Sequence, residues 1–131
     1  MSEATQQVRD WLTRWGSAPY AYLTTTGRRS GQPHRIEIWF GEHRGRMYLL
    51  SGGGGGSDWV RNVRADRRVT VELGDETRAG VARILHDDTD EDRLARDLLV
   101  AKYATPAAPL DDWKRQSLPV AVEFPAGADE A

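Results

Sequence analysis

Apolar residues recur at helical spacing near the start of the chain, over residues 5–15. They stand at positions i, i+3, i+4 and i+7 and include Trp11 and Trp15, which predicts an amphipathic helix. Both indoles are expected to face the core or to cover a ligand. Gly16 and Pro19 are expected to end this helix.

Two further helices are indicated by residues that favour helix starts. One is expected to begin at Ser57 or Asp58, directly after a run of glycines. The other is expected to begin at Thr89, which precedes acidic residues suited to a first turn, and to continue to about Lys102 with leucines on one face. Prolines from Pro106 onward cannot continue it.

The segments between these helices are rich in aromatic and β-branched residues and predict six strands separated by turn-forming residues. The strands are expected at residues 20–26, 34–41, 47–51, 68–74, 78–86 and 119–124, with a turn at 75–77 joining the fourth and fifth. No regular alternation of strands and helices is present. The pattern therefore predicts a mostly β protein, an antiparallel barrel with flanking helices packed on its outside.

A length of 131 residues is that of one domain. We expect an N-terminal helix and linker over residues 1–19, the barrel over 20–124 and a loose tail over 125–131. A dinucleotide-binding Rossmann domain is disfavoured because no GxGxxG follows a first strand.

The chain has no cysteine, which excludes disulfides, thiolate metal sites and cysteine nucleophiles. The three histidines are scattered without metal-binding spacing, so no metal site is expected. No stretch approaches the ~20 apolar residues of a membrane span, and the N-terminus does not resemble a signal peptide. We therefore expect no membrane span and a cytoplasmic location.

The net charge is −2, with basic residues concentrated in the first half of the chain. Arginines alone do not make a nucleic-acid interface, and no known reader motif accompanies them, so nucleic-acid binding is disfavoured.

Residues 24–33 (TTTGRRSGQP) place two arginines and several hydroxyl groups between two glycines. Guanidinium groups match phosphate and carboxylate bidentately, so this loop is a candidate anion site. A solvated hairpin tip has the same composition and is the alternative interpretation.

Residues 51–57 (SGGGGGS) would let backbone amides approach a ligand closely, and the following helix would point its N-terminus at the same place. A flexible linker is the alternative. Trp39, Trp59 and Trp113 could stack on a planar ligand, although tryptophan in a small protein more often fills the core.

Residues 23–33 (LTTTGRRSGQP) resemble the characteristic loop of the deazaflavin-dependent nitroreductase and quinone-reductase family. Residues 46–51, 59–66 and 119–122 are similar to that family's third strand, tryptophan-containing helix and closing strand. The resemblance covers residues 20–124 and implies a split β-barrel of the FMN-binding, pyridoxamine-phosphate-oxidase-like class.

The resemblance also implies coenzyme F420 as cofactor, with its phosphate and glutamate tail on the basic loop and its ring near the third strand. By position, the implied cofactor-binding residues are Arg28, Arg29, Ser30, Trp39, Ser51, Gly52, Gly53, Asp58 and Trp59. Family members often carry a tyrosine over the deazaflavin, and Tyr103 stands nearest to that place as a catalytic proton donor.

The implied reaction is hydride transfer to a small organic acceptor such as a quinone, a nitro compound or an activated alkene. Three alternatives remain open at this point: a split barrel that binds FMN, one that binds a haem-type tetrapyrrole, and an F420 carrier that reduces nothing. A homodimer is also open.

Overall fold

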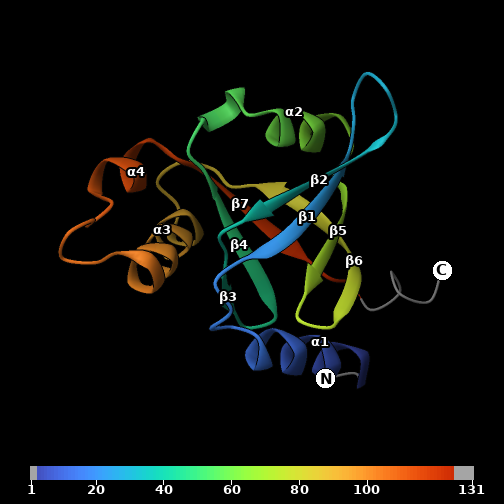
Figure 1. Cartoon of the computed structure of the whole chain (residues 1–131), viewed down its shortest axis with the longest axis horizontal. Helices are drawn as coiled ribbons and strands as arrows, with labels where there is room; N and C mark the ends of the chain where they lie inside the picture. The colour runs from blue at the N-terminus through green and yellow to red at the C-terminus, as the bar shows by residue number, and fades with distance from the viewer. Residues whose placement is uncertain (1–2, 126–131) are drawn as a thin grey trace.

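The structure is a computed structural model that describes residues 3–125, and these residues form one curled sheet with helices around it (Figure 1). Residues 1–2 and 126–131 lie outside the described part, and with them most of the tail expected at 125–131. The strands are β1 (Ala21–Thr26), β2 (Pro33–Ile38), β3 (Gly41–His43), β4 (Arg46–Ser51), β5 (Arg68–Leu73), β6 (Glu76–Ile84) and β7 (Leu118–Glu123). The helices are α1 (Glu3–Arg14), the 3₁₀ turn η1 (Gly54–Gly56), α2 (Asp58–Ala65), α3 (Asp90–Tyr103) and α4 (Asp111–Gln116).

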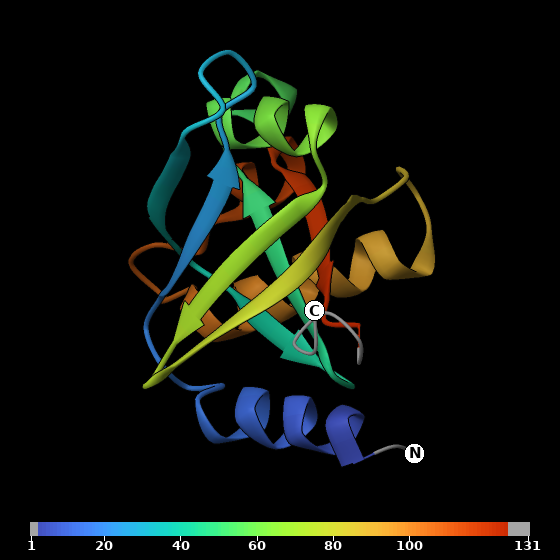
Figure 2. The same ribbon diagram turned by 90° about the vertical axis from the view of Figure 1, so that its right-hand side faces the viewer.

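All seven strands of the described residues belong to one antiparallel sheet in the order β2-β1-β5-β6-β7-β4-β3. β2 and β3 follow each other in the sequence but lie at opposite edges of the sheet. The sheet curls so strongly that it wraps around its own core, as Figure 2 shows. This confirms the antiparallel, mostly β barrel with flanking helices.

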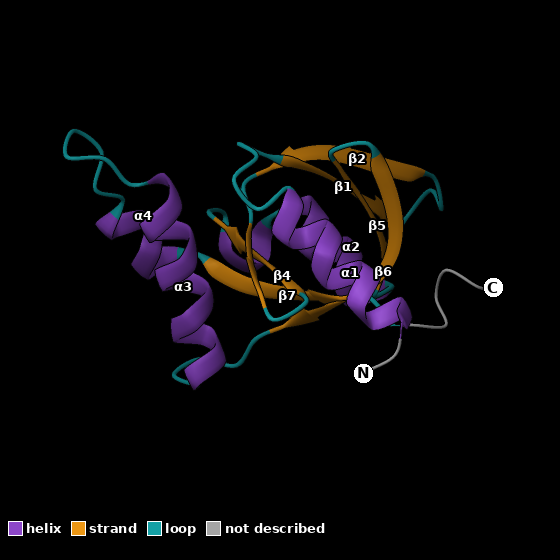
Figure 3. Ribbon diagram, turned by 90° about the horizontal axis from the view of Figure 1, so that it is seen from below, coloured by secondary structure: helices purple, strands orange, loops and turns teal. Residues whose placement is uncertain are grey.

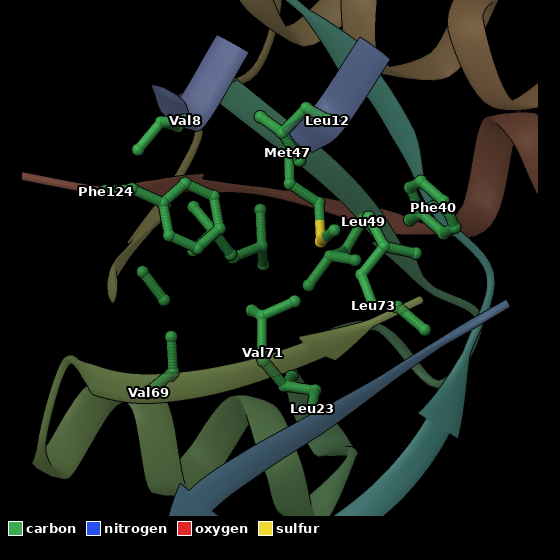
Figure 4. Close-up of a cluster of buried hydrophobic side chains, with 14 of the residues drawn as sticks. Val8, Leu12, Leu23, Phe40, Met47, Leu49, Val69, Val71, Leu73 and Phe124 are labelled. Carbon is green, nitrogen blue, oxygen red and sulfur yellow. The ribbon is translucent and has the colours of Figure 1, made fainter. Parts of the chain in front are cut away.

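The burial pattern of each strand follows from what covers its faces. β1 alternates between buried and half-buried residues, because only its inner face meets the core. β4 is buried from its second residue onward because both of its faces are covered. Met47 and Leu49 point into the barrel core drawn in Figure 4, whereas Tyr48 and Leu50 pack with Leu99 of α3.

Helix α1 lies across one end of the barrel (Figures 1 and 3). Its buried face includes Trp11, whose indole Nε1 donates a hydrogen bond of 3.0 Å to the Leu73 carbonyl oxygen. Trp15 covers Gly74, where a Cβ atom would lie 2.1 Å from the indole and where φ is +64°. Both tryptophans therefore serve the core and the β5–β6 turn, the first of the two roles expected for them.

Several boundaries differ from the sequence-based expectation. The strand expected at 34–41 is divided into β2 and β3, so the described residues contain seven strands rather than six. The β5–β6 turn consists of Gly74 and Asp75 alone, because Leu73 already pairs with Glu76. α4 was not predicted. α3 agrees with the expectation, since the Thr89 hydroxyl accepts a hydrogen bond of 3.1 Å from the Asp92 amide.

No helix within residues 3–125 has the length and apolar character that crossing a membrane requires.

Candidate functional site

The loop between β1 and β2 is a defined turn. The amide of Gly27 donates to the Gln32 carbonyl at 2.8 Å, and the amide of Gly31 donates to the Gly27 carbonyl at 2.8 Å. Gly31 has φ of +72°, a conformation that favours glycine. The hydroxyl of Ser30 accepts a hydrogen bond of 3.1 Å from the Gln32 amide. These bonds fix the direction in which the two arginines leave the loop.

The buried amide of Asn62 on α2 anchors this loop. Its Oδ1 accepts hydrogen bonds from the backbone amide of Arg28 at 3.2 Å and from the guanidinium Nη1 of Arg28 at 3.0 Å. Its Nδ2 donates to the Thr25 hydroxyl at 3.0 Å. Asn62 is only 2% exposed, and its bond to the buried Thr25 is made away from water. Sequence reasoning missed Asn62; the available signal was its place one turn after Asp58 on a short amphipathic helix.

Next to this anchor lies a hollow of about 240 Å³, which we call the basic groove. It is lined by Gly27, Arg28, Arg29, Ser30, His34, Asp58 and Asn62. The structure thus brings together four of the predicted binding residues: the two arginines, Ser30 and Asp58.

The two arginines of the basic groove differ in their freedom. Arg28 is held by Asn62 and by an ion pair of 3.3 Å between its Nη2 and Oδ1 of Asp58. Arg29 is exposed and forms no hydrogen bond or ion pair with another residue of the described part. Arg29 can therefore meet an anion without first giving up a partner.

The glycine run is folded rather than extended. The Ser51 hydroxyl donates to the Gly54 carbonyl at 2.8 Å and lies 2.7 Å from the Ser57 hydroxyl. Ser51 itself is only 1% exposed, so any contact with a ligand would come from the glycine backbone after it. A Cβ atom at Gly54 or Gly56 would meet nothing within 4 Å. This part of the run therefore presents open backbone to solvent.

A second hollow of about 430 Å³ lies between the edge strand β2, strand β4 and helix α4, and we call it the aromatic slot. Its lining residues are Glu37, Ile38, Trp39, Leu50, Leu110 and Trp113. Leu110 has φ of +67°, a left-handed backbone that is costly for a leucine. Such strain persists only where the surroundings hold it, here at the start of α4.

Aromatic contacts shape the slot. The ring of Trp39 stacks on Tyr103 with centroids 4.2 Å apart and planes 5° apart, and it meets Trp113 edge to face at 5.7 Å. Trp39 nevertheless remains 43% exposed. A Cβ atom at Gly52 would lie 3.1 Å from Nε1 of Trp113. The missing side chain at Gly52 therefore lets the indole of Trp113 pack against the end of β4.

Tyr103 sits beneath Trp39 with its hydroxyl already engaged. The hydroxyl donates to the Pro19 carbonyl at 2.9 Å and accepts from the Phe40 amide at 3.1 Å. Burial raises the pKa of the Tyr103 phenol. Its neighbour Lys102 donates to the Phe40 carbonyl at 3.0 Å, and burial lowers the pKa of Lys102 to about 8. The proton-donor role of Tyr103 stays a prediction. In the structure, Tyr103 stacks on Trp39 and its hydroxyl is hydrogen-bonded to the backbone, so its contacts hold Trp39 in place.

Four of the predicted cofactor-binding residues line neither hollow: Ser51, Gly52, Gly53 and Trp59. Gly52 lies beside Trp113 of the slot, whereas Trp59 is partly buried against the barrel core. Within residues 3–125, no group of three or more histidine, aspartate or glutamate side chains is arranged to hold a metal ion.

Two separate segments connect the basic groove with the aromatic slot. β2 and the residue after it run from His34 in the groove to Trp39 in the slot, a span of roughly 16 Å for an extended chain. The glycine run leads from Gly52 beside Trp113 to Asp58 in the groove. The two hollows therefore lie along the same two segments of the chain.

Comparisons with known proteins identify the family of the chain. A family model described as F420H(2)-dependent quinone reductase matches residues 3–125. The solved structure of an F420H2-dependent reductase is 26% identical, with 80% of this chain and 93% of that chain covered and a TM-score of 0.65.

Two more distant structures share the fold alone. One is a candidate pyridoxamine 5′-phosphate oxidase from Listeria innocua, 16% identical over 93% of this chain and 94% of that one, with a TM-score of 0.64. The other is the haem storage protein HutZ from Vibrio cholerae, 12% identical over 92% and 89%, with a TM-score of 0.69. The family match spans all described residues, and the chain therefore belongs to the F420H2-dependent quinone reductase family, as an F420H2-dependent reductase with a split β-barrel fold and coenzyme F420 as its cofactor.

Proposed function

We propose that the protein binds reduced F420 between the basic groove and the aromatic slot and passes its hydride to a small neutral acceptor, such as a quinone, a nitro compound or an activated alkene. The observation that carries the proposal is that β2, with Trp39 after it, runs from the groove to the slot. The glycine run likewise lies between Trp113, a slot residue beside Gly52, and Asp58 of the groove. A cofactor with an anionic tail and a planar ring matches a site with one cationic end and one aromatic end. The homodimer and the cytoplasmic location stay predictions.

The basic groove supplies the anion end of this site. Arg29 is unpaired within the described residues, and the guanidinium group of Arg28 is held in position by its hydrogen bond to Asn62. Guanidinium groups form charge-assisted bonds with phosphate and carboxylate oxygens. The N-terminus of α2 faces the same groove through Asp58, and no side chain caps it, because the Ser57 hydroxyl is bonded to Ser51. Its free amides add a favourable field for an anion.

The aromatic slot supplies the ring end. Trp39 offers one exposed face while Tyr103 supports the other, a geometry suited to stacking a planar ring. Ile38 and Leu50 give the same space apolar walls. When bound, F420H2 supplies the hydride. Glu37 is the single charged residue among those that line the slot, so anionic acceptors are disfavoured and neutral ones are favoured.

The proposal is tested by adding F420H2 to the purified protein and following its oxidation in the presence of a quinone, a nitroaromatic and an activated alkene. Fluorescence titrations with F420 and with FMN accompany the assay. We expect tight F420 binding and turnover with at least one acceptor. Tight FMN binding without F420 binding would overturn the cofactor placement. Tight F420 binding with no turnover of any acceptor would favour a carrier.

A graded series at Gly56 tests whether the glycine run forms a wall of the cofactor site. A Cβ atom at Gly56 meets nothing within 4 Å, so Gly56→Ala and Gly56→Val are expected to leave the unfolding temperature almost unchanged. If the cofactor occupies that space, its affinity should fall in the order glycine, alanine, valine, by more than tenfold at valine. Unchanged affinity in both variants would remove this part of the run from the site.

The partner variant Gly53→Val separates ligand contact from internal strain. Gly53 has φ of −83°, so it needs no left-handed backbone, but its Cβ would lie 2.5 Å from the Ser57 hydroxyl. Valine there should lower both the unfolding temperature and the F420 affinity, because it pushes Ser57 away from the buried Ser51. A stable Gly53→Val protein would contradict the close approach.

Tyr103→Phe tests whether the phenol donates a proton or positions Trp39. Phenylalanine keeps the ring stack but removes the bonds to Pro19 and Phe40, which should cost about 1–3 kcal/mol of unfolding free energy. We expect kcat to fall less than threefold and its pH profile to keep its shape. A loss of a hundredfold or more in kcat, together with a lost pKa in that profile, would instead establish proton donation by Tyr103.

A further inference from the structure

A second cationic hollow lies at the opposite end of the barrel from the basic groove, beside α1, and we call it the α1 pocket. α1 closes that end, whereas the β1–β2 loop and α2 lie at the other (Figure 1). The α1 pocket has a volume of about 230 Å³, and its lining includes Thr5, Arg9, Arg44, Gly45, Arg46 and Glu123. Three arginines thus face one small space that the cofactor site does not use.

Arg9 carries a buried donor without an acceptor. Its guanidinium Nε is buried and has no hydrogen-bond partner within the described part of the chain. The stem of Arg9 lies against Gly45, where a Cβ atom would be 3.1 Å from Cγ and 3.4 Å from Nε. Gly45 has φ of +81°, so glycine is favoured there for two reasons. Native proteins rarely leave such donors unsatisfied, and a bound acceptor is a physical explanation.

The other two arginines are available as well. Arg44 has φ of +50° and forms no ion pair with a residue in the range 3–125. Arg46 is held loosely, at 3.8 Å from Glu91 and 3.6 Å from Glu123. Glu123 makes its shorter contact, 2.8 Å, with Arg83. The α1 pocket therefore has an excess of positive charge that its one lining carboxylate does not neutralise.

We propose that the α1 pocket binds a small oxyanion, a phosphate or carboxylate group, with Arg9 Nε and the Arg44 guanidinium as its principal donors. The anion would join α1 to the β3–β4 turn, since Arg9 belongs to α1 and Arg44 to that turn. It therefore stabilises the closed end of the barrel. This site does not depend on the proposed function.

The test is an NMR titration of the arginine Nε–H signals with inorganic phosphate, supported by thermal unfolding. We expect a saturable shift of the Arg9 signal and a phosphate-dependent rise in unfolding temperature. Arg44→Ala should weaken phosphate binding at this signal at least tenfold. Arg9→Lys keeps the charge but lacks Nε and its signal, so it is read by unfolding temperature, where the phosphate-dependent rise should be largely lost. The matched control Arg29→Ala, in the basic groove, should leave the Arg9 shift unchanged.

A linear, unsaturable shift, or a saturable shift that survives Arg44→Ala, would overturn the proposal; the unfolding temperature without phosphate shows that each variant is folded. Two further arms identify the source of the oxyanion. The first arm compares the affinities for glycerol phosphate and for inorganic phosphate. Tighter binding of glycerol phosphate would mean that the α1 pocket holds the phosphate end of a larger ligand. The second arm uses a variant that ends at Pro125 and so lacks the carboxylates of Asp129 and Glu130. If this variant binds phosphate more tightly than the full chain, these carboxylates compete with phosphate for the α1 pocket.

Discussion

Replacing Arg28 and Arg29 by glutamate is expected to weaken F420 binding by well over tenfold. Two charge-assisted contacts worth roughly 1.5–3 kcal/mol each would be lost, and repulsion from the anionic tail would replace them. Arg28 also anchors the loop through Asn62, and a glutamate there would face Asp58 across the broken ion pair. Part of the double mutant's effect is therefore structural.

The single variant Arg29→Glu isolates the ligand contact, because Arg29 has no partner among the described residues. Its charge-matched control is Arg14→Glu, an exposed position at the end of α1. Fluorescence titration should show a loss of at least tenfold for Arg29→Glu and wild-type affinity for Arg14→Glu. Full affinity in both Arg29→Glu and the folded double mutant would mean that the loop is only a solvated turn.

Asn62→Leu is expected to give the largest loss of stability among these variants. Leucine is close in size but removes both hydrogen bonds to Arg28 and the one to Thr25. Thr25 is buried and would keep an unsatisfied hydroxyl. We expect a loss of about 2–4 kcal/mol in the free energy of unfolding, measured with urea, and weaker F420 binding because Arg28 is no longer preset.

Asn62→Asp is the matched control for this prediction. A carboxylate keeps an acceptor for Arg28, and the Thr25 hydroxyl can turn to donate to it, so this variant should be more stable than Asn62→Leu. If Asn62→Leu unfolded at the same urea concentration as the wild type, the amide would not be the anchor that the distances indicate.

The elements that could be predicted from the sequence are those set by local chemistry. α3 was expected from the Thr89 cap and its acidic first turn, and α1 from the spacing of its apolar residues; both lie where they were expected. Such features need only neighbours within a turn or two of helix. The pairing of Arg28 with Arg29 in one groove was predictable for the same reason, because they are adjacent in one loop.

The break between β2 and β3 was missed because nothing local marks it. Glu37 and Trp39 are exposed, and Phe40 is buried, so the alternation typical of a strand continues through the break. The chain leaves one edge of the sheet there and joins the other, which is a property of the closed barrel. α4 was missed because Pro106 and Pro109 mark a loop, and because its first turn follows Leu110 in a left-handed conformation.

The candidate site was missed where it depends on distant contacts. Asn62 matters because α2 packs on β1, and the sequence gives no sign that its amide meets Arg28. Trp59 resembled a ring-binding residue, yet its helix turns it toward the core. Leu50 and Leu110 reach one slot only after the barrel closes.

The position of β7 has a consequence for how the protein is made. β7 lies between β6 and β4, with Val122 opposite both Ala82 and Met47, although it follows all the other described strands in the sequence. Until it leaves the ribosome, the sheet consists of two pieces, β2-β1-β5-β6 and β4-β3, each with an unpaired edge. Synthesis proceeds from the N-terminus, so these edges are exposed until β7 has been made. The nascent chain is therefore most prone to aggregate just before β7 appears. The aromatic slot also forms late, because Trp113 is made only shortly before β7.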